Sequence, residues 1–165
     1  MRAQPFHLGH ELIIKKMLGE CERAVVMLGC LAIDKGISNH ENPISFYDRL
    51  RMITNVFEKD MDAGRLLISF VNDIGNRKLW AGYVLAKMWQ TFGIEANAYY
   101  CGQGQDASLF KAAGLDVKEI SRVDLPICAT KIREGVHAGD LSVLMHVNKA
   151  NRQLVQEVLT KNIRG

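Results

Sequence analysis

Residues 2–10, RAQPFHLGH, decide the fold because a helical pattern of apolar residues, Leu8 to Glu22, begins inside them. The N-terminus of a helix offers unpaired N–H groups and the positive end of its dipole, which together suit a phosphate group. Gly9 removes a side chain where a nucleotide must approach the backbone, and Pro5 stiffens the entry. His7 and His10 can turn their rings toward the same phosphate oxygens. The stretch therefore indicates a phosphate cradle, although His-x-x-His pairs also occur as metal ligands and, more often, as structural histidines.

Beyond this stretch, strand-like and helical patterns alternate, which is typical of a parallel sheet with helices on both faces. The predicted strands cover 24–28, 66–71, 96–101 and 117–120. One predicted helix begins after the capping residue Ser45. Further helices are predicted at 78–92, 106–113, 130–136 and 149–161, and Gly93 ends the helix at 78–92. The polar stretch 34–43 is predicted as a surface loop. The sequence thus predicts an α/β fold.

A doubly wound sheet normally begins with a central strand, and this chain leaves no room for one ahead of the first helix. We therefore expect a Rossmann-like sheet whose first strand is missing. The 165 residues, 48% hydrophobic and 24% charged, form an ordinary composition for one globular domain, so we expect residues 1–165 to fold as a single unit.

The same composition excludes several classes of protein. No apolar run approaches the roughly 20 residues of a membrane-spanning helix, and no secretion signal precedes the first helix, so we expect a cytoplasmic protein without a membrane partner. A net charge of +3 is too mild to indicate nucleic-acid binding. The four cysteines stand far apart, which excludes a C-x-x-C zinc site and favours reduced, mostly buried thiols.

A second motif, ICATKIR at residues 127–133, stands at another predicted helix start. Thr130 can cap backbone N–H groups or touch a phosphate, and Arg133 can offer a forked pair of donors to terminal phosphates. A Thr-x-x-Arg sequence at a helix start is also common as a plain cap. The two motifs together favour nucleotide binding.

The two motifs resemble the H-x-G-H and S-T-x-I-R signatures of the nucleotidyltransferase superfamily, with Ala129 in the place of the usual Ser. The resemblance narrows to nicotinamide-mononucleotide adenylyltransferases of the archaeal type and the similar domain of bifunctional bacterial enzymes. It rests further on Arg2-x-Gln-Pro, Asp48-Arg49, Asp73 followed by Trp80, and the stretch 101–108, and it spans residue 2 to about residue 140.

The resemblance implies a Rossmann-like nucleotidyltransferase fold and the transfer of AMP from ATP to nicotinamide mononucleotide (NMN), giving NAD and pyrophosphate, with Mg²⁺ bound through ATP and no metal ligands in the protein. It implies catalytic roles for His7, His10 and Arg133. The implied ATP-binding residues are Gln4, Phe6, Gly9, Gly102, Asp106, Thr130 and Ile132. The implied acceptor-binding residues are Arg2, Arg49, Asp73 and Trp80. Relatives are often oligomers, so the resemblance also allows a homo-oligomer.

Other interpretations of these residues stay open. Trp80 is by composition a core aromatic, Arg49 stands beside Arg51 on a helix and suits solvent, and Asp73 suits a helix cap. The glycines of 102–104 are ordinary after a strand. Alternative functions are a related adenylyltransferase with pantetheine phosphate or FMN as acceptor, and a nucleotide-binding module without turnover.

Overall fold

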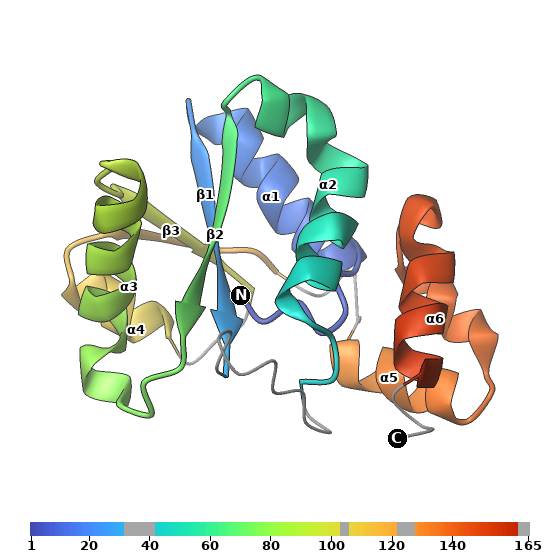
Figure 1. The fold of residues 1–165 in the computed structure, drawn as a ribbon. Helices are drawn as coiled ribbons and strands as arrows, with labels where there is room; N and C mark the ends of the chain where they lie inside the picture. The colour runs from blue at the N-terminus through green and yellow to red at the C-terminus, as the bar shows by residue number, and fades with distance from the viewer. Residues whose placement is uncertain (32–41, 103–105, 122–127, 162–165) are drawn as a thin grey trace.

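The computed structural model describes residues 1–31, 42–102, 106–121 and 128–161, and helices and strands alternate over much of their length (Figure 1). Most of the predicted loop at 34–43 lies outside these described residues. The elements are α1 (Leu8–Glu20), β1 (Ala24–Cys30), α2 (Phe46–Asp62), β2 (Leu66–Asn72), α3 (Arg77–Phe92), β3 (Ala98–Cys101), α4 (Ala107–Ala112), β4 (Asp116–Glu119), α5 (Ala129–His137), the 3₁₀ helices η2 (Leu141–His146) and η3 (Lys149–Asn151), and α6 (Arg152–Lys161).

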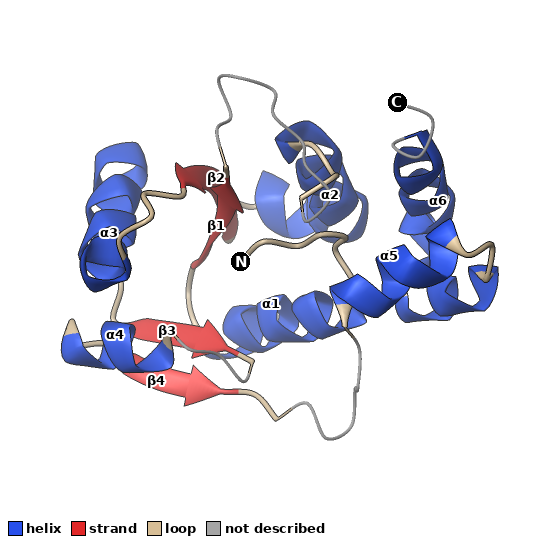
Figure 2. Cartoon of the chain, turned by 90° about the horizontal axis from the view of Figure 1, so that it is seen from below, coloured by secondary structure: helices blue, strands red, loops and turns tan. Residues whose placement is uncertain are grey.

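The α/β fold with parallel strands is confirmed, but the expected single sheet is not continuous in the described part of the chain. Strand β1 pairs in parallel with β2, from Ala24 opposite Leu66 to Cys30 opposite Asn72. Strand β3 pairs in parallel with β4 and forms a second, separate ladder. Figure 2 shows β3 and β4 beside α1 and α4, apart from β1 and β2.

Local signals explain where several helices begin and end. The Ser45 hydroxyl oxygen accepts a hydrogen bond from the N–H of Asp48 at 3.1 Å and starts α2, as predicted. Gly93 ends α3 with φ of 64°, a left-handed conformation that favours glycine. The predicted helix at 149–161 begins as the 3₁₀ turn η3, and no sequence pattern predicted η2.

The main core lies among α1, α2, β1 and the C-terminal helices, with α3 on the opposite side of β1 and β2 (Figure 1). The C-terminal helices are fixed to α2 through the fully buried Asn151. Its amide donates to the carbonyl of Met52 at 2.7 Å and accepts from Asn55 at 2.9 Å. This anchor brings α5 close to the start of α1. None of the helices within the described ranges is long and apolar enough to cross a bilayer.

Candidate active site

Helix α1 begins at a cap built from two histidines. His7 is the N-cap residue, and its Nδ1 accepts a hydrogen bond from the N–H of Gly9 at 3.1 Å. The N–H of His7 lies 3.4 Å from Nδ1 of His10, and the two ring centroids are 3.9 Å apart. A neutral ring whose Nδ1 accepts carries its proton on Nε2, so each Nε2 is a donor. The two histidines therefore lie against one another at the positive end of α1, and their contact with one phosphate group stays a prediction.

Gly9 leaves room for this arrangement. A Cβ at position 9 would lie 3.0 Å from Cε1 of His7, tighter than nine in ten Cβ contacts in proteins. A larger residue would make the His7 ring shift by a few tenths of an ångström. The reason for glycine is thus a close approach within the protein itself, in addition to the approach of a nucleotide that the sequence suggested.

Phe6 holds His10 from the other side. Its ring stacks on His10 with centroids 5.9 Å apart and meets Phe57 of α2 edge-on at 6.4 Å. The Phe6 side chain is buried in the main core, so it packs within the protein and positions the His10 ring. A contact of Phe6 with ATP stays a prediction.

Arg133 joins the two sequence motifs in space. Its Nη1 donates to the carbonyl of Gln4 at 2.6 Å, across 129 residues of sequence, and its Nη2 donates to the Thr130 hydroxyl at 3.3 Å. The start of α5 and the segment leading into α1 are therefore in direct contact. We call the set His7, Gly9, His10, Thr130 and Arg133 the nucleotide cradle.

Two residues expected to bind ATP support the cradle from within. The Gln4 amide is buried and bonds both backbone groups of Ile44, at 2.9 and 2.8 Å. Ile132 is buried in the main core. Both side chains are buried, and a contact of either residue with ATP stays a prediction. Their burial fixes the two segments that Arg133 connects.

The start of α5 favours negative charge. Cys128 is the N-cap of this helix, and the backbone N–H of Lys131 lowers the pKa of its exposed thiol below the usual value. The sequence predicted mostly buried thiols and gave no role to this residue. The shift follows from the free N–H groups of a helix N-terminus, the same property that suits a phosphate.

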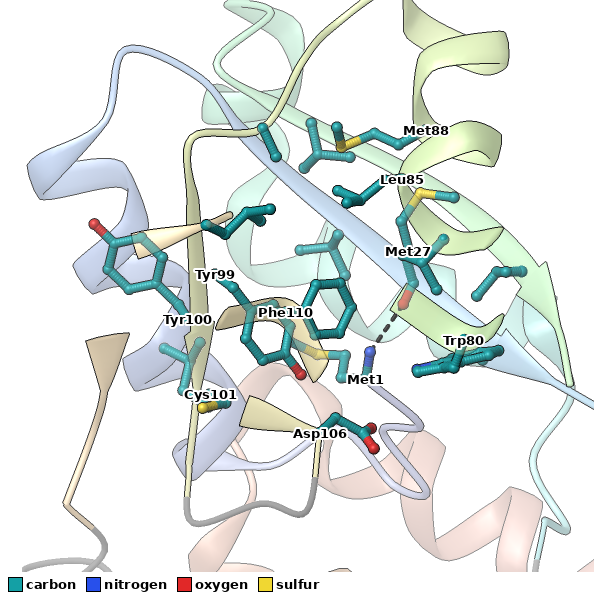
Figure 3. Close-up of a pocket in the computed structure, with 18 of the residues that line it drawn as sticks. Met1, Met27, Trp80, Leu85, Met88, Tyr99, Tyr100, Cys101, Asp106 and Phe110 are labelled. Carbon is teal, nitrogen blue, oxygen red and sulfur yellow. Dashed lines mark hydrogen bonds between the residues drawn. The ribbon is translucent and has the colours of Figure 1, made fainter. Parts of the chain in front are cut away.

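A cavity of about 650 Å³ is lined by residues along β1 and β3, such as Met27 and Tyr99 (Figure 3). It reaches the carboxyl ends of these strands at Cys30 and Cys101, and His10 of the cradle also lines it. Ligand crevices of open α/β sheets lie at this edge. Its lining brings together three residues predicted for the acceptor, two predicted for ATP and one predicted to be catalytic: Arg2, Asp73 and Trp80, then Gly102 and Asp106, and His10. Four of the lining residues are Arg2, Asp73, Trp80 and Asp106, and we call the part of the cavity that they line the acceptor cavity.

The charged and aromatic groups of the acceptor cavity are loosely held. Arg2 and Asp73 approach within 3.9 Å, with side chains 66% and 46% exposed. The Asp73 carboxylate also accepts from the N–H of Gly75 at 2.9 Å, in the turn after β2. Trp80 is half-buried on α3, with its ring centroid 6.3 Å from that of Tyr83. These groups have room to rearrange around a ligand.

Comparisons with known proteins find relatives that are named as adenylyltransferases. No family model matches the chain. Nicotinamide-nucleotide adenylyltransferase 1 of Sulfolobus acidocaldarius is 26% identical over 161 residues, which are 95% of this chain and 86% of that protein. The nicotinamide-nucleotide adenylyltransferase of Caldivirga maquilingensis is 25% identical over 159 residues, covering 95% of this chain and 85% of that protein. This chain is homologous to archaeal nicotinamide-nucleotide adenylyltransferases.

A solved structure has a similar fold. A bifunctional NMN adenylyltransferase/ADP ribose pyrophosphatase from Francisella tularensis, complexed with AMP and a manganese ion, superposes with a TM-score of 0.78 at 19% identity. The superposition covers 99% of this chain and 50% of that one, so the chain spans half the length of the bifunctional protein. The likeness to its nucleotidyltransferase fold confirms the predicted fold class.

Arg49 departs from its expected place among the acceptor-binding residues. It is 3% exposed, and its guanidinium donates to the carbonyls of Arg2 at 2.7 Å, Gly29 at 2.8 Å and Ser45 at 3.2 Å. Its remaining amino group lies 3.2 Å from the sulfur of Cys30. The side chain is therefore used within the protein, where it holds the backbone of Arg2 against the end of β1.

Within the described ranges, no three His, Cys, Asp or Glu side chains gather in a way that would hold a metal ion. The carboxylate nearest in sequence to the histidines, Glu11, is buried and accepts from Asn148 at 3.0 Å and Lys15 at 2.6 Å. It therefore anchors the C-terminal segment to α1, a role that the sequence did not reveal.

Proposed function

We propose that this chain transfers AMP from ATP to NMN, giving NAD and pyrophosphate. The observation that supports the proposal most is the contact of Arg133 with the carbonyl of Gln4, because it closes the cradle around the start of α1. The acceptor cavity, with a half-buried tryptophan and an arginine, opens beside that cradle. A triphosphate and an aromatic mononucleotide phosphate would then meet at one edge of the molecule.

The reaction needs no nucleophile from the protein. The phosphate of NMN is already an anion at neutral pH, and one of its oxygens attacks the α-phosphorus of ATP in line with the bond to the β-phosphate. The new O–P bond forms as the bond to the bridging oxygen breaks, and pyrophosphate leaves with the electron pair. Catalysis then depends on alignment and on stabilising the charge that grows on the phosphates.

The residues of the nucleotide cradle would contact different phosphates of ATP. We assign the Nε2–H donors of His7 and His10 to the α- and β-phosphates, with the dipole of α1 behind them. Arg133 would hold the β- and γ-phosphates with its forked donors, while Thr130 places the end of α5 beneath them. Gly102 and Asp106, after β3, would approach the ribose of ATP.

On the acceptor side, Trp80 would stack on the nicotinamide ring and Arg2 would bind the acceptor phosphate. The pairing of Arg2 with Asp73 keeps that guanidinium at the mouth of the cavity before the acceptor arrives. Because Arg49 is fully used in backbone contacts, its role is to position Arg2 rather than to bind the phosphate itself.

ATP enters as its complex with a divalent cation, which we propose to be Mg²⁺. The cation would be held by the phosphate oxygens and water, a mode in keeping with the way Mg²⁺ usually binds nucleotides. Such a cation would supply positive charge that offsets the negative charge of the leaving pyrophosphate. The protein residues described above act on the phosphates directly.

The decisive assay incubates the protein with ATP and Mg²⁺ and one acceptor at a time: NMN, pantetheine phosphate or FMN. Formation of NAD and pyrophosphate with NMN, and of no product with the other two, supports the proposal. Turnover with another acceptor only would keep the chemistry and replace the substrate. Binding of ATP without release of pyrophosphate in any mixture would replace the enzyme by a nucleotide-binding module.

A further inference from the structure

Helix α5 carries Arg133, and the 3₁₀ helix η2 packs against α5 after a short turn. The N–H of Asp140 in this turn donates to the carbonyl of Gly135 at 2.9 Å. The Asp140 carboxylate accepts from the N–H of Ser142 at 3.0 Å and caps η2. The turn therefore ties the start of η2 to α5.

Gly135 allows η2 to lie directly on α5. A Cβ at position 135 would overlap Cγ1 of Val143, and it would lie 2.9 Å from Cγ2 and 3.2 Å from Cβ of that residue. Valine is branched at Cβ and restricted at χ1, so rotation of its side chain would not fully remove the conflict. The spacing of the two elements is therefore set by a glycine on one side and a branched side chain on the other.

The segment of residues 141–151, which we call the C-terminal brace, is also fixed to α1 and α2. The Asn148 amide donates to the carboxylate of Glu11 at 3.0 Å, and Glu11 directly follows His10 on α1. The fully buried Asn151 holds the other end of the brace to α2, through the two hydrogen bonds described above. The brace is thus anchored beside one half of the nucleotide cradle.

The C-terminal brace connects the two halves of the cradle. One of its contacts, at Glu11, is next in sequence to His10, and the other, at Gly135, is two residues after Arg133. The bond from Arg133 to the Gln4 carbonyl joins the halves directly, but a single bond from a long side chain with many rotamers does not fix the helix that carries it. Helix α5 lies between α1 and α6 and packs mainly against η2 and α6, so this packing sets its position (Figure 2).

We propose that the C-terminal brace positions Arg133 for the triphosphate, with Val143 as the positioning residue that acts on Gly135. The inference rests on the proposed function, in which Arg133 binds the β- and γ-phosphates. A change in the spacing of Gly135 and Val143 moves α5 and carries the Arg133 guanidinium away from the start of α1. ATP spans both halves of the cradle, so it then binds more weakly. AMP has no β- or γ-phosphate, so it binds as before.

The test changes positions 135 and 143 in the whole chain. G135A adds a methyl group where η2 meets α5, V143A removes bulk there, and the double variant G135A/V143A moves the bulk from one side to the other. The matched control is G19A, at an exposed glycine of α1. Among the described residues, an added Cβ at position 19 meets nothing within 4 Å outside its own stretch of helix. Calorimetric titration with ATP and with AMP is carried out for each variant.

G135A is expected to bind ATP about tenfold more weakly than wild type, the scale of losing a hydrogen-bonded charge, and to bind AMP as wild type does. V143A should weaken ATP binding severalfold, because α5 then packs loosely. The double variant should bind ATP within about threefold of wild type, since it nearly conserves volume. If G135A does not fold, tighter ATP binding by the double variant than by V143A supports the proposal. Equal ATP affinity in wild type, V143A and the double variant overturns it, as does equal weakening for ATP and AMP.

A measurement without nucleotide separates this inference from the proposed function. Loss of the Arg133 bond to Gln4 in R133A should lower the thermal midpoint of the wild-type chain by roughly 2–4 °C. In the V143A background the same change should have a smaller effect, and in the double variant the full effect should return. If the wild-type chain binds no ATP, the proposed function fails, while an equal effect of R133A in all three backgrounds overturns the positioning by Val143.

Discussion

The nucleotide cradle and the acceptor cavity share one edge of the molecule but are held in different ways. In the cradle, His7 is 8% exposed, its ring is fixed by the N–H of Gly9, and Arg133 is tied to a carbonyl at 2.6 Å. In the cavity, Arg2 and Asp73 are largely exposed and only loosely paired. If the two sites bind as we propose, we expect a preorganised site for the triphosphate, where charge develops, and an adaptable site for the acceptor.

The largest effect is expected from H10A, which removes one donor from the preorganised side. The kcat for NAD formation should fall by on the order of 10²–10³-fold, the scale of losing one transition-state donor. Steady-state kinetics measures this, and the thermal midpoint should change little. The exposed His137, at the end of α5, provides the control variant H137A. An H10A enzyme within twofold of wild type would remove His10 from the mechanism.

The R49K variant tests whether the buried hydrogen bonds of Arg49 stabilise the protein rather than bind the acceptor. In R49K the lysine cannot serve the carbonyls of Arg2, Gly29 and Ser45 together, so the free energy of unfolding should fall by about 3 kcal/mol and the thermal midpoint by roughly 6–12 °C. The exposed Arg51 on the same helix gives the matched control R51K. A stable R49K protein with a raised KM for NMN alone would restore the sequence-based interpretation of Arg49 as an acceptor ligand.

Trp80 tests the adaptable side. W80A should raise the KM for NMN about tenfold while leaving the KM for ATP nearly unchanged, since stacking of an aromatic side chain on a base contributes roughly 1–3 kcal/mol. Trp89, 54% exposed on the same helix, provides the control W89A. Equal losses for both substrates in W80A would identify Trp80 as a core residue.

The smallest effect is expected at the start of α5. Iodoacetamide should alkylate Cys128 faster than the half-buried Cys21, because the thiol of Cys128 has the lowered pKa and the greater exposure. Saturating ATP should slow that reaction severalfold by covering the helix end, as followed by mass spectrometry of the labelled peptide. An unchanged rate with ATP would separate this end of α5 from the nucleotide.

The sequence predicted the parts of the site that local rules decide. A helix N-terminus with His-x-Gly-His and a second with Thr-x-x-Arg are local patterns, and the structure brings them into contact. The burial of Arg49 could not be predicted from the sequence, because it depends on carbonyls of Arg2 and Gly29, which come together only in the folded chain.

The same limit applies to residues assigned to ATP. Gln4 belongs to a motif, but its amide pairs with the backbone of Ile44, 40 residues away, and no local pattern specifies that partner. The ring of Phe6 turns into the core against Phe57. Long-range packing therefore decides which motif residues face the ligand and which support those that do.

We propose that one triphosphate is held between α1 and α5, and calorimetric titration of R133A with ATP and with AMP tests this most directly. We expect R133A to bind ATP at least tenfold more weakly than wild type, since a hydrogen-bonded charge contributes about 1.5–3 kcal/mol, and to bind AMP as well as wild type does. Equal weakening for ATP and AMP, or unchanged binding of both, would contradict it.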